Sequence, residues 1–552
     1  MTYEPDGEQR AVIDSSAPVI VVLGGAGTGK TSTAAAAARA HLLRADQRRA
    51  AVARDAVLSG QRTALPAPDR VLFLSFSRTA VSQVIDRAGG VIGPLLQRID
   101  VNTFDGFAWR VICHYGRAHG YPPPQVVLSA ANSRVDGMRS GLTYGQLIPA
   151  AAHILRAPEV AAHYGGRYGL IICDEFQDTD DEEWEFLQLI APRARRVFLG
   201  DLNQCIYSFK KVDPHGRVAE ALALDGAVSL PLRPASHRDP SGVLPAAADA
   251  ARERDFDHPA IREAVAAGRL RLVEADSASH HRVAADLVTN ARERRHTVSV
   301  FTHTIKATSE LSDTLTTMGI AHEQVGFGEA QGEAAGAQLE MLKYALAIPG
   351  AQARRALAVY VTATTKGSQL PELAEHLMNR SNPDLEKIMK NIGGELRAAG
   401  AVTSVDYAAI VEIISGSYAR LGAARGLETW AEATPRLRRN VRSLAGGLPW
   451  DDVAAAADRT RFDTLVGGMA TRRRPVQVMN LHQTKGREAD TTILLLQEDE
   501  WHGRETHPFP QGSRLVYVLL TRARHSAYIV VPPIQHPLWA PLVTACQQWA
   551  GP

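Results

Sequence analysis

The sequence predicts an α/β protein with two parallel sheets in tandem, each interrupted by a mostly helical insertion. Short β-branched runs alternate with longer stretches rich in Ala, Leu and Arg, the pattern of parallel strands with crossover helices. The strand runs form two similar series, which indicates a duplicated fold with a cleft between the copies. At 552 residues, the chain is long enough for about three to four domains.

The first series of strands is expected at Val19–Leu23, Val71–Phe76, Ile99–Thr103, Leu170–Cys173, Val197–Leu199 and Val228–Leu230. The second series is expected at Leu270–Glu274, Thr297–Phe301, Val476–Leu481, Thr491–Leu496 and Ala527–Val531. We therefore assign residues 1–104 and 169–258 to a first lobe, and residues 259–349 and 470–552 to a second lobe.

Two stretches interrupt the strand rhythm and are interpreted as insertions, one at 105–168 and one at 350–469. We expect both insertions to be mostly helical. Two basic runs, Arg436–Arg442 and Arg472–Arg474, fit phosphate binding and a solvated helix face equally well. For three tryptophans, Trp430, Trp450 and Trp501, core packing is favoured over a role as DNA wedges.

Composition narrows the class of protein. The net charge is +2, so any contact with nucleic acid must come from local basic stripes. Four cysteines lack metal-ligand spacing and read as reduced thiols. The polar, acidic N-terminus is unlike a secretory signal, and no apolar run reaches the ~20 residues needed to span a bilayer. We expect a cytoplasmic protein with no membrane partner.

A phosphate-binding loop follows the first predicted strand, with the pattern Gly24-x-x-x-x-Gly29-Lys30-Thr31 before a helix-forming run. Its backbone N–H groups would approach the phosphates, and the helix N-terminus adds a favourable dipole. Lys30 would neutralise the β- and γ-phosphates, and the Thr31 hydroxyl would bind Mg²⁺. The nucleotide would also contact the rest of the loop, namely Gly24, Gly25, Ala26, Gly27, Thr28, Gly29 and Ser32. The motif by itself predicts an ATP-binding triphosphatase of a broad class.

An acidic pair, Asp174-Glu175, ends the apolar strand Leu170–Cys173. A carboxylate at this edge of a sheet can hold magnesium, and its neighbour can polarise the attacking water. We assign Asp174 to the metal and Glu175 to the base. Taken alone, the pair would more commonly be the charge of a helix N-terminus, but the following Phe176-Gln177-Asp178 and the upstream phosphate loop favour the metal and base roles.

A polar loop, Gly200–Phe209, follows another apolar strand. Gln204 could sense the γ-phosphate, with Tyr207 and Phe209 close behind it as an aromatic platform. Alternatively, this is a polar loop followed by two core aromatics.

The ordered set of motifs resembles the UvrD/Rep/PcrA group of superfamily 1 helicases over nearly the whole chain, which implies two RecA-like lobes. By this resemblance, Gln9 reads adenine, and Phe76 lies on the DNA path with the segment Val101–Phe104. The hydrolysis motifs are Cys173–Asp178 and Gly200–Phe209. The implied DNA contacts are Phe76, Thr103, Phe104, Tyr207, Phe209 and His482.

The later motifs complete the resemblance. In Ser236-His237-Arg238, Arg238 would meet the γ-phosphate, and His237 stands where an adenine-stacking tyrosine is usual. In Val478–Glu488, His482 would face DNA and Glu488 the ribose; Asn480 replaces the usual threonine and Arg487 an apolar residue. In Arg514–Ala523, Arg522 would be the arginine finger.

These features predict a DNA-dependent ATPase that uses ATP and Mg²⁺. The resemblance implies that it moves 3′ to 5′ on single-stranded DNA and separates strands at single-strand/duplex junctions in DNA repair or recombination. The insertions look short beside those of large family members. This favours an alternative, a DNA-stimulated ATPase sensor subunit that partners a nuclease in phage defence. A third interpretation, a small-molecule phosphate-loop enzyme, conflicts with aromatics placed beside Gln204.

Overall fold

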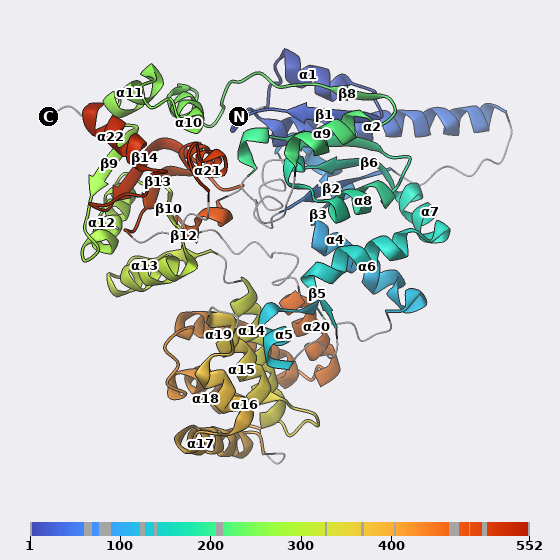
Figure 1. Ribbon diagram of the computed structural model, residues 1–552. Helices are drawn as coiled ribbons and strands as arrows, with labels where there is room; N and C mark the ends of the chain where they lie inside the picture. The colour runs from blue at the N-terminus through green and yellow to red at the C-terminus, as the bar shows by residue number, and fades with distance from the viewer. Residues whose placement is uncertain are drawn as a thin grey trace. The chain divides into compact units, whose positions relative to one another are not determined.

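The computed structural model describes residues 3–59, 69–76, 90–121, 127–136, 141–205, 213–325, 328–365, 369–401, 405–462, 474–484, 486–498 and 505–549. They form two compact units (Figure 1). The first, which holds both large sheets, comprises Met1–Phe107, Ala151–Val325 and Ala470–Pro552; the second comprises Ala108–Ala150 and Gly326–Met469.

The first sheet has six parallel strands in the order β3-β2-β6-β7-β1-β8. All six predicted strands of this series are confirmed, with ends that differ by a few residues. The apolar runs of the four inner strands are buried because helices cover both faces of a parallel sheet, whereas the two edge strands are only partly buried. The strands are β1 (Val19–Leu23), β2 (Arg70–Ser75), β3 (Ile99–Thr103), β6 (Tyr168–Cys173), β7 (Arg195–Gly200) and β8 (Ala227–Ser229).

The second sheet is also parallel, in the order β11-β12-β10-β13-β14-β9. The five predicted strands of this series are confirmed. The edge strand β11 (Glu323–Gln324) was not predicted, because two polar residues carry no strand pattern. The others are β9 (Leu270–Glu274), β10 (Val298–Thr302), β12 (Val476–Asn480), β13 (Ala489–Leu495) and β14 (Ala523–Val531).

Helices pack on both sheets. Ala34, Ala38 and Leu42 of α2 (Lys30–Leu58) join the core of the first sheet. Two clusters bury the faces of the second sheet, one formed with α10, α11, α21 and α22 and the other with α12 and α13. The other helices of this unit are α1 (Gly7–Asp14), α7 (Pro158–Arg167), α8 (Asp181–Leu189), α9 (Pro214–Leu222), α10 (Val243–Glu253), α11 (Pro259–Ala266), α12 (His280–Glu293), α13 (Ile305–Thr317), α21 (Pro510–Leu520) and α22 (Ala540–Trp549).

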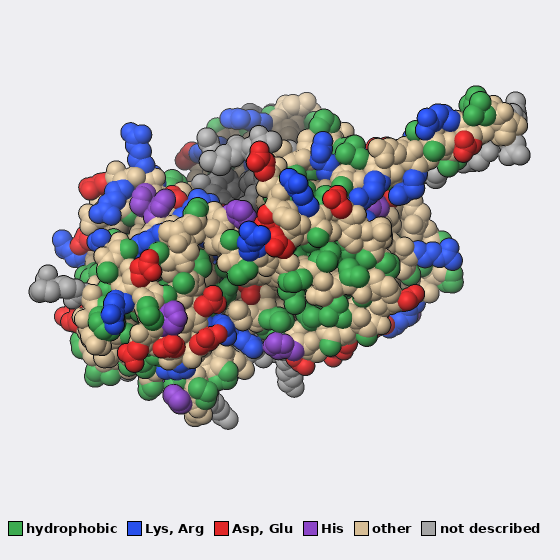
Figure 2. All heavy atoms as spheres, turned by 90° about the horizontal axis from the view of Figure 1, so that it is seen from above, with side chains coloured by type: hydrophobic (Ala, Val, Ile, Leu, Met, Phe, Trp, Pro, Cys, Tyr) green, Lys and Arg blue, Asp and Glu red, His purple; other side chains and the backbone are tan. Residues whose placement is uncertain are grey.

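Helix α2 is longer than the sheet that it covers. Its 29 residues carry it past the edge of the first sheet, and its far end protrudes as an arm with arginines and apolar side chains at its surface (Figure 2). Leu58, in its last turn, is 85% exposed. The packing of α2 on the sheet is therefore confined to its first half, whose N-terminus carries the phosphate-binding loop.

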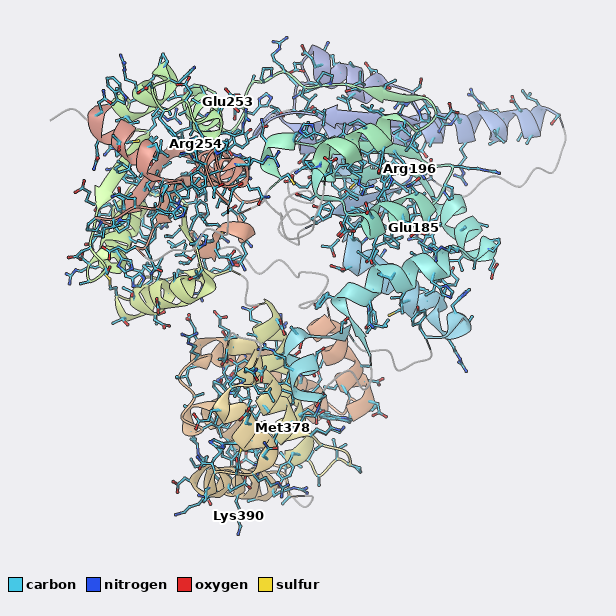
Figure 3. All side chains as sticks on the ribbon, viewed as in Figure 1. Glu185, Arg196, Glu253, Arg254, Met378 and Lys390 are labelled. Atoms are coloured by element: carbon cyan, nitrogen blue, oxygen red, sulfur yellow. The ribbon has the colours of Figure 1, made fainter. Side chains whose placement is uncertain are left out.

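Among its described residues, the second unit is helical apart from the two-stranded β4–β5 pair (Val127–Leu128 and Leu142–Thr143). Its helices include α5 (Ala130–Asp136), α14 (Gly328–Ala345), α15 (Ala353–Thr364), α16 (Glu372–Asn379), α17 (Pro383–Ala399), α18 (Tyr407–Arg420), α19 (Leu427–Ala445) and α20 (Trp450–Phe462). Met378 of α16 and Lys390 of α17 mark this unit in Figure 3. Helices α4 (Phe104–Tyr115) and α6 (Tyr144–Leu155) each span a boundary between the two units.

Two tryptophans of the second unit, Trp430 and Trp450, belong to its core. Trp430 is 1% exposed and packs with the rings of Tyr360 and Tyr418. Its indole N–H donates to the Ile414 carbonyl at 3.0 Å. Trp450 packs against the same core, whereas Trp501 lies outside the described residues. For Trp430 and Trp450 the core interpretation is confirmed.

Candidate functional site

The phosphate-binding loop lies at the carboxyl end of β1 and leads into α2. Two of its glycines adopt positive φ, +80° at Gly27 and +86° at Gly29. A Cβ atom at Gly27 would lie 2.3 Å from the Ser236 hydroxyl, and one at Gly29 would lie 2.9 Å from the Gln9 amide nitrogen. The loop can therefore close on these neighbours only with glycine at both positions.

Lys30 and Thr31 begin α2 inside this loop. The Lys30 ammonium donates to the carbonyls of Gly24 at 2.6 Å and Gly25 at 2.9 Å, and it lies 4.0 Å from an Asp201 oxygen. The Thr31 hydroxyl donates to Asp174 Oδ2 at 3.3 Å. The structure therefore brings together the two residues predicted to hold magnesium. A hydroxyl and a carboxylate are hard oxygen ligands that suit Mg²⁺, which keeps most of its remaining positions for water and phosphate.

Asp174 and Glu175 follow β6. Burial, together with the charge of Glu175, raises the pKa of Asp174. Glu175 has a positive φ of 55° and accepts a 2.7 Å hydrogen bond from the Gln177 amide. Gln177 in turn accepts from the Asp201 backbone N–H at 3.0 Å. The predicted base is thus positioned by a residue that links the two hydrolysis motifs.

Arg522 reaches the site from the second sheet. It is 2% exposed, and burial, reinforced by the charge of Arg238, lowers its pKa to about 10. Its guanidinium donates to Gln204 Oε1 at 2.7 Å, and the Gln204 amide donates to Asp201 Oδ2 at 2.6 Å. The predicted arginine finger and the predicted γ-phosphate sensor are therefore in direct contact.

Arg238 bridges to the second sheet as well. It donates to Glu488 Oε2 at 2.6 Å and to the Thr521 carbonyl at 2.5 Å. The other Glu488 oxygen accepts from Arg524 at 2.7 Å. The predicted ribose contact of Glu488 stays a prediction, because this carboxylate faces two arginines here.

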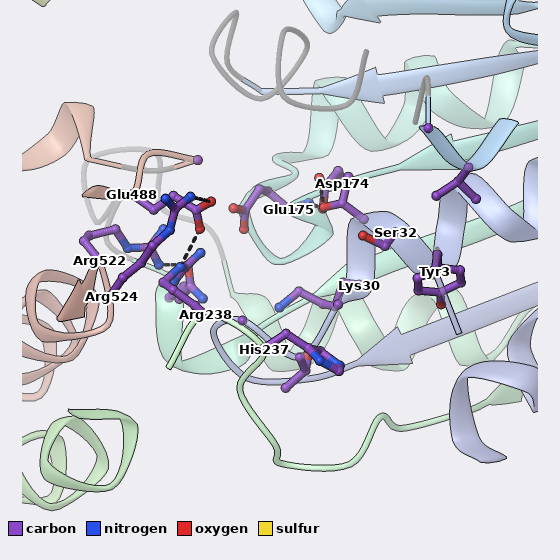
Figure 4. A pocket seen from close by; sticks show the side chains of 18 of the residues that line it. Tyr3, Lys30, Ser32, Asp174, Glu175, His237, Arg238, Glu488, Arg522 and Arg524 are labelled. Carbon is purple, nitrogen blue, oxygen red and sulfur yellow. Dashed lines mark hydrogen bonds and ion pairs between the residues drawn. The ribbon is translucent and has the colours of Figure 1, made fainter. Parts of the chain in front are cut away.

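One cavity of about 620 Å³ collects these groups (Figure 4), a volume typical of a small-molecule site. It is lined by Tyr3, Glu4, Gly27, Thr28, Gly29, Lys30, Thr31, Ser32, Gly90, Val91, Asp174, Glu175, Gln204, His237, Arg238, Gly486, Glu488, Arg522 and Arg524. Figure 4 shows Lys30, Asp174 and Glu175 on one side and Glu488, Arg522 and Arg524 on the other.

Gln9 lies beneath the loop. Its amide donates to the Thr28 carbonyl at 3.2 Å and lies 3.5 Å from the His237 ring nitrogen. The residues predicted to read adenine are thus neighbours, and His237 itself lines the cavity.

Three residues in or beside the cavity were not predicted from the sequence, namely Arg524, Asp201 and Tyr517. Arg524 lines the cavity two residues beyond the predicted finger. Asp201 lies in the same loop as Gln204. Tyr517 accepts from the Ala26 backbone N–H at 3.2 Å and donates to Asp201 at 3.4 Å. Of these three residues, only Asp201 could have been recognised from its local sequence, because it is an acidic residue directly after a buried strand.

Three of the predicted DNA contacts, Phe76, Thr103 and Phe104, are not among the residues that line this cavity. Phe76 and Phe104 are in ring contact, with centroids 4.9 Å apart. Thr103 and Phe104 are buried, and the Thr103 hydroxyl accepts from the Gly106 N–H at 3.0 Å. Tyr207, Phe209 and the His482 side chain lie outside the described residues, so a DNA path through these six residues stays a prediction.

Two absences hold for the described part of the chain. It contains no group of three or more His, Cys, Asp or Glu side chains arranged to hold a metal ion. Nor does any helix within the described ranges have both the length and the apolar character that crossing a bilayer requires.

Comparisons with known proteins agree with the motifs. Residues 6–143 and 128–218 match the UvrD/REP helicase N-terminal domain. An ATP-dependent helicase/nuclease subunit of Streptococcus sanguinis (strain SK36) is 36% identical over 72 residues, which are 13% of this chain and 6% of that protein. The protein of the same name from Streptococcus thermophilus (strain ATCC BAA-491 / LMD-9) is 39% identical over 57 residues, 10% of this chain and 5% of its own length.

Among solved structures, S. cerevisiae Dbp5 bound to RNA and ADP BeF3 aligns with 99% of this chain and 88% of its own. The identity is 8% and the TM-score 0.39, which is too weak for a functional comparison. The matches to the two helicase/nuclease proteins likewise span only small fractions of those relatives. The resemblance carried by the motifs is nevertheless confirmed over this part of the chain: residues 6–218 match the UvrD/REP helicase N-terminal domain.

Proposed function

We propose that the protein is an ATP-dependent DNA helicase or translocase that moves 3′ to 5′ on single-stranded DNA, in the cytoplasm, and couples ATP hydrolysis to strand separation in repair or recombination. One observation carries the proposal. Groups from both sheets, Lys30 and Glu175 from the first and Arg522 from the second, line a single cavity of about 620 Å³.

In this proposal each side chain has a defined task. Lys30 leaves the loop carbonyls for the β- and γ-phosphates, because a phosphate is the stronger acceptor for an ammonium. Glu175 takes a proton from the attacking water. Thr31 and Asp174 would hold Mg²⁺, which would neutralise phosphate charge when bound. Arg522 would exchange Gln204 for the transferring phosphoryl group, a contribution that in related enzymes is about 10³–10⁵ in rate.

Hydrolysis would be coupled to movement through the cleft. The phosphates attract Lys30 on one lobe and Arg522 on the other, so a bound triphosphate favours a closed arrangement. Loss of the γ-phosphate removes that attraction. Stacking of a base on an aromatic ring contributes about 1–3 kcal/mol, and opening one base-pair step costs roughly 1.4 kcal/mol. One or two captured bases per cycle would therefore suffice for strand separation.

The test compares ATP hydrolysis with and without a single-stranded oligonucleotide, and unwinding of duplexes that carry a 3′ or a 5′ tail. We expect hydrolysis to rise with DNA and unwinding to start from the 3′ tail. A rate that ignores added DNA would reject the motor, and unwinding from the 5′ tail alone would reject the polarity. Lys30→Ala protein is the negative control.

A second candidate is supported by the names of the relatives, which describe parts of a helicase/nuclease. In that case the chain would be a DNA-stimulated ATPase sensor subunit that partners a nuclease in phage defence. The same assays separate the two candidates, because a sensor would hydrolyse ATP in response to DNA yet leave both tailed duplexes intact.

A further inference from the structure

Glu488 divides its carboxylate between two arginines. Oε2 accepts from Arg238 Nε at 2.6 Å, and Oε1 accepts from Arg524 Nη2 at 2.7 Å. The side chains of Arg238 and Glu488 are 12% and 10% exposed, so water screens their pairing only weakly. The arginine assigned to the γ-phosphate is thus held by an anion in the cavity itself.

Arg524 also contacts a second carboxylate, that of Asp490. Its second terminal nitrogen lies 3.4 Å from Asp490 Oδ1. The other Asp490 oxygen accepts from the Thr297 backbone N–H at 2.9 Å and from the Thr297 hydroxyl at 2.8 Å. Positively and negatively charged side chains therefore alternate from the cavity to the start of β10, in the order Arg238, Glu488, Arg524 and Asp490.

We propose that Arg524 is a positioning residue that acts through Glu488 and sets how readily Arg238 is released to the terminal phosphate of the nucleotide. The inference rests on the proposed ATP-hydrolysing function. It adds that Arg524 helps the same site to bind a nucleoside triphosphate more tightly than a diphosphate. The inference follows from the shared carboxylate: because Glu488 also pairs with Arg524, it holds Arg238 less strongly.

The expected consequence is a change in the fraction of molecules whose Arg238 is available to bind a phosphate. Loss of the Arg524 guanidinium concentrates the charge of Glu488 on Arg238, so fewer molecules have Arg238 available for a phosphate. The apparent affinity for a triphosphate falls by the same factor as that fraction. ADP offers no terminal phosphate to Arg238, and its affinity should stay nearly constant.

The experiment measures binding of ATPγS and of ADP, each with Mg²⁺, to the full chain. For Arg524→Gln we expect ATPγS affinity to fall about tenfold while ADP affinity changes less than twofold. Arg524→Lys keeps the charge, but one ammonium cannot span both carboxylates, so its loss should be about threefold. This milder variant also serves if Arg524→Gln is poorly folded.

Coupling to Glu488 provides the decisive comparison. In a Glu488→Gln background the anion that holds Arg238 is gone, so adding Arg524→Gln should leave ATPγS affinity within about twofold. Arg271→Gln, an arginine of β9 outside the cavity, should leave both affinities as in the wild type.

Equal weakening of ATPγS and ADP would show that Arg524 acts only as a positive charge, and an undiminished loss in the Glu488→Gln background would exclude action through Glu488. Either result overturns the inference, as does an unchanged Arg524→Gln protein. Wild-type protein that binds neither nucleotide would instead overturn the proposed function itself.

Discussion

The guanidinium of Arg522 donates a 2.7 Å hydrogen bond to the side-chain oxygen of Gln204, across 318 residues of sequence. Arg522 follows α21 beside the second sheet, and Gln204 follows β7 of the first. In the proposed function, a phosphate of the nucleotide would replace Gln204 as the partner of Arg522. The site is thus assembled from both sheets, and four predictions test its parts and the fold beneath it.

Replacing Arg522 with Ala should lower kcat for ATP by about 10³-fold or more, because the finger stabilises charge that develops in the transition state. The KM for ATP should change far less. Steady-state hydrolysis with saturating single-stranded DNA measures both quantities. Arg294→Ala, an exposed arginine in the same lobe, should behave as the wild type; a kcat of the Arg522→Ala protein within tenfold of the wild type would refute the role.

Glu175→Gln should bind nucleotide but turn over about 10²–10⁴-fold more slowly, since an amide cannot accept the proton of the attacking water. Its hydrogen-bonding shape is retained beside Gln177, so thermal stability should stay close to that of the wild type. Single-turnover hydrolysis together with nucleotide binding separates the two effects. Unchanged hydrolysis would reject the assignment of Glu175 as the base.

Gly27→Ala should abolish nucleotide binding. Its φ of +80° is strained for alanine, and the added methyl would meet the Ser236 hydroxyl at 2.3 Å. Gly319 is a matched control, because its φ is +72° and its Cβ position is open. Gly319→Ala should show the backbone penalty alone, about 1–2 kcal/mol in the free energy of unfolding, with hydrolysis intact. If Gly27→Ala still binds ATP, the close packing of the loop on Ser236 is not required.

Asp100 on β3 gives a pH dependence of stability. Burial would raise its pKa, but hydrogen bonds from Arg70, Tyr168 and Arg167 outweigh burial and lower it to about 2. A lowered pKa in the folded state stabilises the protein above the unfolded pKa of about 3.9, and this stabilisation is lost as the pH falls toward 2.

Asp100→Asn should therefore lower the free energy of unfolding at pH 7 by about 1–2 kcal/mol, after allowance for solvent screening. The deficit should shrink as the pH falls from about 4 toward 2. Urea unfolding at several pH values measures it, and a deficit that is constant across this range would contradict the ion-pair origin.

Local sequence was sufficient for the strands and for recognising the phosphate-loop motif, whereas the nucleotide contacts stay predictions. Parallel strands buried on both faces, such as β1 and β13, carry near-continuous apolar runs, so eleven of the twelve strands of the two large sheets were predicted, with β11 as the exception. The phosphate loop was equally visible, because its spacing and its glycines are fixed by local backbone geometry. The DNA-contacting residues and the finer domain boundaries stay predictions.

Long-range side-chain partners were not visible in the sequence. Nothing near Arg524 or Tyr517 signals that these residues reach Glu488 and Asp201. The helical unit shows the same limit, since Arg355 donates to Asp136 at 2.8 Å over 219 residues. Such pairs depend on how distant segments pack, and no local periodicity records that packing.

By itself, then, the sequence determined two parallel sheets and a glycine-rich loop between β1 and α2, because strand burial and loop conformation are local properties of a chain; the roles of Lys30, Asp174 and Glu175 stay predictions. Only the tertiary structure decided that Arg522 meets Gln204 and that Glu488 is shared between Arg238 and Arg524. These charges pair because folding excludes water from a common cavity and brings them within hydrogen-bonding distance.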